Sequence, residues 1–304
     1  MTALAGSSSV KLPRPSAVLE LIKPITWFPP IWAYVCGVVA VGGAGGARPL
    51  DDWPLVLMGM VLAGPVVCGM SQAANDWCDR HVDAINEPGR GIPSGRIPGR
   101  WGLWIALAMT ALSLMLGWTL GPWGFAATVA GVLAAWAYSA EPVRLKRSGI
   151  WGPGLVGLCY EGLPWVTGAA VLSAGAPPLP VIAVALLYAL GAHGIMTLND
   201  FKAIEGDRAT GIASLPATLG PERAARVACT VMLVAQAAVV ACLLGWDRPI
   251  HAAIIAASML AQLLAMRVLL RDPRGRAPWY NGTGVTLYVA GMIVAALALR
   301  GVGL

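Results

Sequence analysis

Charged residues are scarce in this chain of 304 residues, since only 12% of them are Asp, Glu, Lys or Arg. A soluble globular domain carries about 25% charged residues. This chain is instead 57% hydrophobic, with a mean hydropathy of +0.69. We therefore exclude a soluble fold and expect an all-α membrane protein that crosses the bilayer many times. We attribute the net charge of +6 to Lys and Arg residues in the loops on the inner side of the membrane, and we expect no nucleic acid partner.

Cysteine pairs with the spacing of metal or redox sites are also missing. The six cysteines form no CxxC pair and mostly fall within apolar runs, so we expect neither a zinc site nor a disulfide framework. The first residues lack an apolar core ahead of a small-residue cleavage site, and we expect no removable signal peptide. Residues 1–24 are predicted to form a cytoplasmic N-terminal segment, and residues 25–304 a single polytopic domain.

Apolar runs long enough to span about 30 Å of hydrocarbon predict nine transmembrane helices. They lie near residues 25–44, 54–75, 101–120, 122–139, 150–173, 179–199, 226–245, 249–270 and 283–300. With the N-terminus in the cytoplasm and the C-terminus outside, 18 of the 21 Lys and Arg residues fall in inner segments. This split obeys the positive-inside rule and predicts a multi-pass protein of the cell's inner membrane.

An acidic stretch follows the second predicted span and reads NDWCDRHVDAINEPGRGIPSG, from residue 75 to residue 95. If the helix continues through it, Asp76, Asp79 and Asp83 share one face over about 10 Å. Three carboxylates near a helix C-terminus repel one another and the helix dipole, which favours a multivalent cation. Magnesium takes one or two protein carboxylates plus substrate phosphate oxygens. The stretch therefore predicts a site for a magnesium-bound diphosphate.

A second stretch, residues 199–220, repeats the first in outline 124 residues later. Both begin with Asn-Asp directly after a predicted span and continue through Asp and Arg to Gly-Ile. This repetition predicts two four-helix units plus a ninth helix, with the two acidic ends facing a central cavity. On a regular helix Asp200 and Asp207 share a face, whereas Glu205 points elsewhere. We expect the second acidic end to hold a second magnesium ion.

Polar residues near the two stretches are candidates for substrate binding, because cations stabilise a diphosphate and ionisable groups inside a membrane are costly. Two candidates stay open between two roles. Glu161 is either an acceptor contact or half of a structural ion pair, and His193 is either an acceptor or metal contact or a hydrogen-bonded core histidine. The full set comprises Asn75, Arg80, Arg90, Tyr138, Arg144, Lys146, Glu161, His193, Asn199, Lys202 and Arg208.

These motifs resemble those of the UbiA-type intramembrane prenyltransferases. The family's first signature, NDxxDxxxD, is matched in full from Asn75 to Asp83, and EGDR-x-x-GI-x-S-L-P resembles its second. The resemblance implies nine helices and Mg2+ as the cofactor. It also implies catalytic and metal-binding roles for Asp76, Asp79, Asp83, Asp200 and Asp207. Many members have DxxxD in the second motif, but its first position here is Ala203, so that role passes to Asp200.

Within the family, the segments TWFPPIWAYVCGVV, YSAEPVRLKR, CYEGLPW and NDFKAIEGDR look most like the chlorophyll and bacteriochlorophyll synthase branch. This likeness implies an isoprenoid diphosphate donor, geranylgeranyl or phytyl, and the propionate carboxylate of bacteriochlorophyllide as acceptor. It also implies a photosynthetic membrane, with pigment-assembly partners that stay unknown. Aromatic faces shield the allylic cation that such a reaction forms. The aromatic candidates are Trp27, Trp32, Tyr138 and Trp165.

Other functions are compatible with parts of the pattern. The metal motif alone also fits prenylation of a quinone precursor or of haem. Paired acidic sites in a duplicated helical bundle also occur in cation and anion transporters. A pigment-binding protein with His193 as ligand is a further alternative, although it leaves the two acidic stretches unexplained.

Overall fold

The computed structural model describes residues 11–42 and 52–302. In these ranges the fold is all-helical, with no strand beyond an isolated β-bridge between Ser148 and Ala213. The first half comprises α1 (Pro15–Leu21), η1 (Pro24–Thr26), α2 (Phe28–Val41), α3 (Trp53–Val61), η3 (Leu62–Cys68), α4 (Gly69–Asn86), α5 (Trp101–Thr119) and α6 (Gly121–Ser139). The second half comprises η4 (Leu145–Arg147), α7 (Trp151–Gly157), η5 (Leu158–Gly162), α8 (Leu163–Ser173), α9 (Leu179–Asn199), η6 (Asp200–Lys202), α10 (Ile204–Thr210), α11 (Leu215–Leu219), α12 (Pro221–Gly245), α13 (Pro249–Leu269), α14 (Pro273–Gly282) and α15 (Gly284–Ala298).

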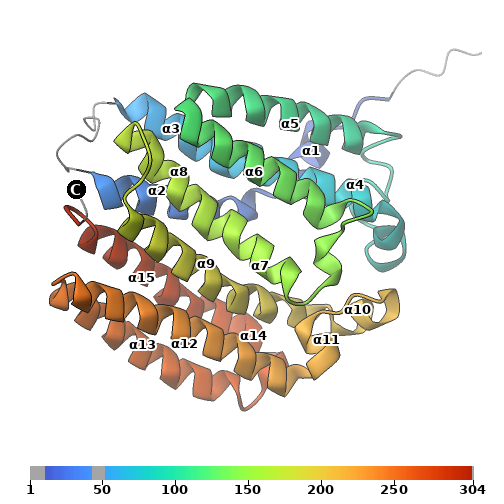
Figure 1. The fold of residues 1–304 in the computed structure, drawn as a ribbon. Helices are drawn as coiled ribbons and strands as arrows, with labels where there is room; N and C mark the ends of the chain where they lie inside the picture. Colours follow the sequence, from blue (N-terminus) through green and yellow to red (C-terminus); the bar gives the residue numbers. More distant parts are fainter. Residues whose placement is uncertain (1–10, 43–51, 303–304) are drawn as a thin grey trace, which may run out of the picture.

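Seven helices among the described residues are long and apolar enough to cross a membrane, and a bent pair gives an eighth candidate. The pair consists of residues 15–26 and α2, which meet at an angle of 51°. Helix α6 has the same length as α5, 19 residues, and packs beside it (Figure 1). The protein is thus a multi-pass membrane protein. Residues 1–10 of the predicted N-terminal segment and residues 43 and 44 of the first predicted span lie outside the described ranges.

Two of the long spans contain a π-helical turn, and a proline accounts for each turn. The turn η3 contains Pro65, which has no N–H group to continue the α-helical hydrogen bonds. The turn η5 directly precedes α8, in which Pro164 likewise cannot donate a backbone hydrogen bond. Both turns supply residues to the same cavity, described below.

The main core joins α2 to α8, α9 and the helices from α12 to α15. Helices α2 and α8 approach closely because of two glycines: a Cβ on Gly37 would lie 1.9 Å from the Trp165 carbonyl oxygen, and one on Gly168 would lie 2.1 Å from that of Tyr34. Small residues at such crossings let membrane helices pack backbone to backbone. A second cluster joins α1 to α4, α5 and α6. Between these two packed groups lies the cavity.

The core also corrects two aromatic predictions. The Trp165 ring is fully buried and stacks on Tyr188 with ring centroids 5.7 Å apart, so it cannot shield a cation in the cavity. The Trp32 indole donates a hydrogen bond to the Val289 carbonyl oxygen at 3.1 Å and ties α2 to α15. Of the four aromatic candidates, Tyr138 lines the cavity.

Candidate active site

Helix α4 continues as predicted through Asp76, Asp79 and Asp83 of the first acidic stretch, and it ends at Asn86. Its aspartates lie on one inward face, since Asp76 and Asp83 are buried and both are within reach of one guanidinium group. Arg90 Nη1 lies 2.9 Å from Asp83 Oδ2 and 3.5 Å from Asp76 Oδ1. The same arginine also bonds Glu87, with Nε 2.5 Å from Oε2. The stretch therefore folds back at residue 90 and places a cation over its own carboxylates.

Three further cations come from other elements. Lys23 donates a hydrogen bond from Nζ to Asp76 Oδ1 at 2.7 Å. Arg144 Nη2 lies 3.0 Å from Asp79 Oδ1, and Lys146 contacts the other oxygen of that carboxylate. The mutual repulsion expected among the aspartates is thus compensated by neighbouring positive charges. A site of this composition carries both signs of charge that a metal–diphosphate complex needs.

Two of these cations have unusual backbone conformations. The φ angles of Lys23 and Arg144 are +44° and +37°, in the left-handed region that few residues other than glycine adopt. Such outliers cluster at functional sites, where the surrounding fold stabilises them. Burial lowers the pKa of Lys146, which lies two residues beyond Arg144, while the charge of Asp79 opposes that shift. The fold thus holds these cations against the aspartates at a cost in backbone strain and desolvation.

The second acidic stretch does not form the regular helix expected there. Helix α9 ends at Asn199, a short 3₁₀ turn begins at Asp200, and α10 starts only after Ala203. Asp200 and Asp207 nevertheless interact electrostatically across this break. The two carboxylates are therefore neighbours, although the face of a continuous helix does not bring them together.

The side chains of α10 divide between the interior and the surface. Asp207 is buried and accepts a hydrogen bond from the Ser214 hydroxyl at 2.5 Å. Burial raises the pKa of Asp207, and the Ser214 hydrogen bond opposes the shift. Glu205 points away from the interior, as predicted, and forms an exposed salt bridge with Arg274 of α14.

The two acidic clusters share a space at one end of the bundle. Asp79, Asp200 and Asp207 all act electrostatically on the Tyr138 hydroxyl at the end of α6. A Cβ on Gly206 of α10 would lie 4.0 Å from the amide nitrogen of Asn86, the last residue of α4. Figure 1 shows the end of α4 and α10 on the same side of the molecule. The two acidic clusters therefore lie at the same end of the bundle.

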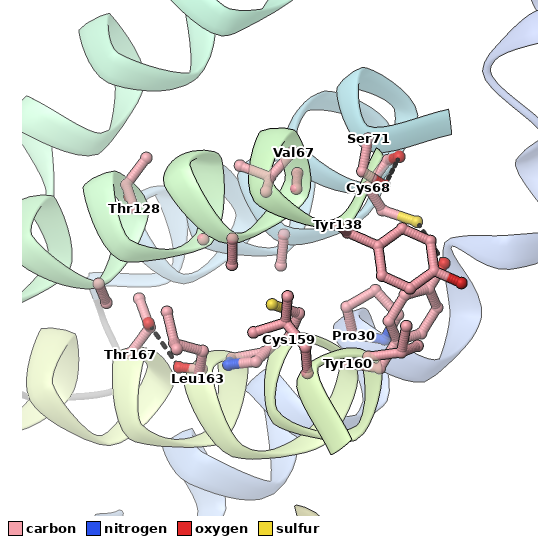
Figure 2. Close-up of a pocket in the computed structure, with 18 of the residues that line it drawn as sticks. Pro30, Val67, Cys68, Ser71, Thr128, Tyr138, Cys159, Tyr160, Leu163 and Thr167 are labelled. Carbon is pink, nitrogen blue, oxygen red and sulfur yellow. Dashed lines mark hydrogen bonds between the residues drawn. The ribbon is translucent and has the colours of Figure 1, made fainter. Parts of the chain in front are cut away.

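A cavity of about 230 Å³ extends from this end into the bundle. Asn75 and Tyr138 belong to its lining, and its walls come from α4 with η3, from α6, and from α7 with η5 and α8 (Figure 2). Beside Tyr138, the Tyr160 hydroxyl accepts a hydrogen bond from Gln72 Nε2 at 3.1 Å and lies 3.4 Å from Cys68 Sγ. The cavity is otherwise lined mainly by small and apolar side chains.

Several predicted substrate-binding residues have other contacts. Arg80 donates to the Trp77 carbonyl oxygen at 2.8 Å, and its guanidinium lies 4.1 Å from the centre of the Trp77 ring. Arg208 donates to the Ala217 carbonyl oxygen at 3.1 Å. Asn199 accepts a hydrogen bond from Asn281 at 2.8 Å. These contacts give the three side chains protein partners, whereas Lys202 is exposed beside the second cluster.

Glu161 and His193 both lie outside the cavity lining. Glu161 is buried in the π-turn η5, and its Oε2 has no hydrogen-bond partner among the described residues. The ion pair, one of the two roles considered for Glu161, is not observed among the described residues. His193 Nδ1 lies 3.5 Å from Thr197 Oγ1, and the ring packs against Gly154 of α7. His193 is partly buried, and its role stays a prediction.

The carboxylates suit a hard divalent cation that arrives with its substrate. In the part of the chain that the structure describes, no three His, Cys, Asp or Glu side chains form a ready-made metal cluster. Magnesium needs only one or two protein carboxylates, with waters and phosphate oxygens completing its octahedron. The first cluster offers three carboxylates and the second offers two, beside a shared space, and Asp76, Asp83 and Asp207 among them are buried. The donor set therefore fits magnesium bound to a diphosphate.

Residues 31–285 match the UbiA prenyltransferase family. The chain belongs to this family. It is 73% identical over 290 residues to the bacteriochlorophyll synthase 33 kDa chain of Cereibacter sphaeroides, covering 95% of each chain. It is 64% identical over 293 residues to the protein of that name from Rhodobacter capsulatus, also covering 95% of each chain. A UbiA homolog from Archaeoglobus fulgidus, solved with DMAPP and Mg2+, shares the fold: the TM-score is 0.70 at 20% identity, over 94% of this chain and 99% of that one.

The family places this protein among the prenyltransferases and confirms the resemblance that the two motifs indicated. The structure adds three residues near the site that the sequence did not reveal. Lys23 precedes the first span and counted only as a topology signal, while Gln72 and Tyr160 are neutral residues within apolar runs. The one sequence signal for Lys23 is its position at the inner end of the first span, next to Pro24.

Proposed function

We propose that this protein esterifies the propionate carboxylate of bacteriochlorophyllide with a geranylgeranyl or phytyl group and releases diphosphate. This reaction belongs to bacteriochlorophyll biosynthesis. The observation that carries the proposal is the 73% identity to a bacteriochlorophyll synthase over 95% of both chains. Two acidic clusters beside an apolar cavity agree with a donor that has a charged head and an apolar tail. Transfer to a quinone precursor or haem, and ion transport, are not favoured by these relatives.

We assign magnesium to the two carboxylate clusters, with Asp76, Asp79 and Asp83 on one side and Asp200 and Asp207 on the other. The burial of Asp76, Asp83 and Asp207 and the Mg2+ bound by the Archaeoglobus homolog support this assignment. When bound, magnesium supplies Lewis-acid stabilisation of the leaving diphosphate. Ala203, at the position where many family members have a second-motif Asp, leaves the second cluster with two carboxylates.

The protein's own cations hold the rest of the diphosphate charge. Lys23, Arg90, Arg144 and Lys146 already meet carboxylate oxygens, and phosphate oxygens are acceptors of the same kind. As donor binds, these side chains exchange part of their contact with aspartate for contact with phosphate. The negative charge on the departing oxygen then develops against fixed donors, which lowers the barrier without reorganisation of water.

The cavity accounts for the remaining steps. The allylic C–O bond breaks with its electron pair going to the diphosphate, and the cation forms where Tyr138 and Tyr160 line the wall. Aromatic faces stabilise a cation by roughly 0.5 to 2 kcal/mol each, and the apolar wall excludes water. The acceptor propionate is ionised at neutral pH, so its oxygen attacks the prenyl carbon without a general base.

We also infer nine membrane spans, by counting the bent pair and α6 with the seven apolar helices. The two acidic ends then face the cytoplasm, with the N-terminus inside and the C-terminus outside, in the inner or photosynthetic membrane. The 18 inner Lys and Arg residues support this orientation. The matching Asn-Asp pairs at residues 75 and 199 support two four-helix units plus a ninth helix, within a single domain over residues 25–304.

An acceptor comparison tests the proposed reaction. Purified protein in detergent or membranes is given geranylgeranyl diphosphate and Mg2+, with bacteriochlorophyllide in one reaction and 4-hydroxybenzoate in another. We expect esterified pigment and an equal amount of diphosphate in the first reaction only. Product with 4-hydroxybenzoate alone would overturn the acceptor, and no product with either would overturn the proposed activity.

A further inference from the structure

The cavity has a direction, because its polar and apolar ends differ. Tyr138 lies at the end next to the acidic clusters, while Thr128 and Thr167 lie at the opposite end (Figure 2). Asn75 lies near Tyr138, since its amide donates to Ser139 Oγ at 3.4 Å. Both threonine hydroxyls are hydrogen-bonded to carbonyl oxygens of their own helices, so neither needs a partner from the cavity. The far end is therefore suited to hydrocarbon, and its two threonines are buried.

The length of the cavity along α6 corresponds to a definite number of prenyl units. Lining residues of α6 run from Tyr138 to Ala127, which is about 16 Å at 1.5 Å per residue. A prenyl unit adds four chain bonds of about 1.5 Å in a zigzag, or about 4 to 5 Å. A diphosphate held at the acidic end therefore places three to four units inside the cavity. Gly131 stands about 10 Å from Tyr138, after roughly two units.

Gly131 leaves the passage open at that point. It is buried in the lining, and a Cβ there would lie 3.7 Å from Val67 and 3.9 Å from Leu163, on two other walls of the cavity. One methyl group fits in ordinary contact with these side chains, whereas anything larger must enter the passage. The backbone does not require glycine, because Gly131 is not among the residues with positive φ. Glycine is less favourable than alanine inside a helix, so its presence here points to a need for space.

We propose that Gly131 determines donor length by admitting the third and fourth prenyl units of the tail into the far half of the cavity. The inference rests on the proposed function, since it takes an isoprenoid diphosphate as the donor. A larger side chain at residue 131 limits the tail to two prenyl units, and a larger side chain at residue 127 limits it to three.

The test is the affinity of S-thiolodiphosphate analogues with ten, fifteen and twenty carbons, measured by calorimetry with Mg2+ present. Burial of each methylene contributes about fourfold in affinity. Gly131→Leu is therefore expected to weaken the fifteen- and twenty-carbon analogues by about 100-fold or more, with the ten-carbon analogue within threefold of the wild type. Ala127→Phe is expected to weaken the twenty-carbon analogue alone, and it tests the proposal independently if Gly131→Leu does not fold.

Two variants control for added bulk. Ala130→Leu adds the same side chain to the exposed face of α6 one residue away, and Gly131→Ala adds only the methyl group that fits; both should leave all three affinities within threefold. Equal weakening of all three analogues, or an unchanged twenty-carbon affinity in folded Gly131→Leu, overturns the role of Gly131. If the wild-type protein binds none of the analogues, the proposed function itself fails.

Discussion

Replacement of Lys146 by alanine tests whether the inner-loop cations hold the donor diphosphate. The Lys146 side chain is 9% exposed and contacts Asp79, whereas that of its neighbour Arg147 is 52% exposed and pairs with Glu141. Two charges 4 Å apart interact by about 4 kcal/mol at an effective dielectric constant of 20. Arg144 also contacts Asp79 and compensates part of the loss. We expect Lys146→Ala to lower kcat/KM for the donor by about 30- to 150-fold, or roughly 2 to 3 kcal/mol.

The assay varies one substrate while the other saturates. When geranylgeranyl diphosphate is varied, Lys146→Ala should show the full predicted loss of donor kcat/KM. When bacteriochlorophyllide is varied, the KM for this acceptor should stay near the wild-type value. Arg147→Ala is the matched control and should stay within about fivefold, since an exposed ion pair contributes about 0 to 1 kcal/mol. Thermal unfolding of both variants checks the fold. Equal losses of donor kcat/KM in Lys146→Ala and Arg147→Ala would refute the reasoning. A rise in KM confined to the acceptor would refute it as well.

Three further predictions concern metal, the missed lysine and helix packing. EDTA should stop turnover and Mg2+ should restore it; turnover that persists under chelation contradicts the role of the aspartates. Lys23→Met removes the contact with Asp76 and should lower donor kcat/KM by about 10- to 100-fold, whereas exposed Lys11→Met should change it less than twofold in the same assay. Gly168→Ala forces α2 and α8 apart and should lower the thermal unfolding midpoint, at a cost of about 1 to 3 kcal/mol; Gly245→Ala, which meets nothing within 4 Å, should not.

The shared face of the first acidic stretch was predictable because one helix, α4, carries all three of its aspartates. Regular periodicity from residue 69 to residue 86 converts the spacing of Asp76, Asp79 and Asp83 directly into a shared face. The same rule fails after Asn199, where a 3₁₀ turn interrupts the helix. No periodicity in the sequence marks that break. Asp200 and Asp207 interact electrostatically, but the continuous helical face that predicted their proximity is not what the structure shows.

Other features of the site depend on tertiary packing, and the sequence pattern indicates them only weakly. Lys23 meets Asp76 across 53 positions, and positive charge at the inner end of a span is expected for topology alone. Tyr160 becomes a cavity residue through the π-turn before Pro164, a geometry that apolar run length does not report. Glu161 was visible as an ionisable group in a span, but only the fold shows that it faces the core, without a hydrogen-bond partner for Oε2 among the described residues.

The backbone bridge at Ser148 has a mechanical consequence. Ala213 donates to the Arg147 carbonyl oxygen and accepts from the Gly149 amide, both at 2.9 Å. These two hydrogen bonds fasten the loop that carries Arg144 and Lys146 to the segment that leads into Ser214, the hydrogen-bond partner of Asp207. A displacement of either loop therefore requires the other to move with it or these two hydrogen bonds to break. We expect the two halves of the site to respond together when a diphosphate binds.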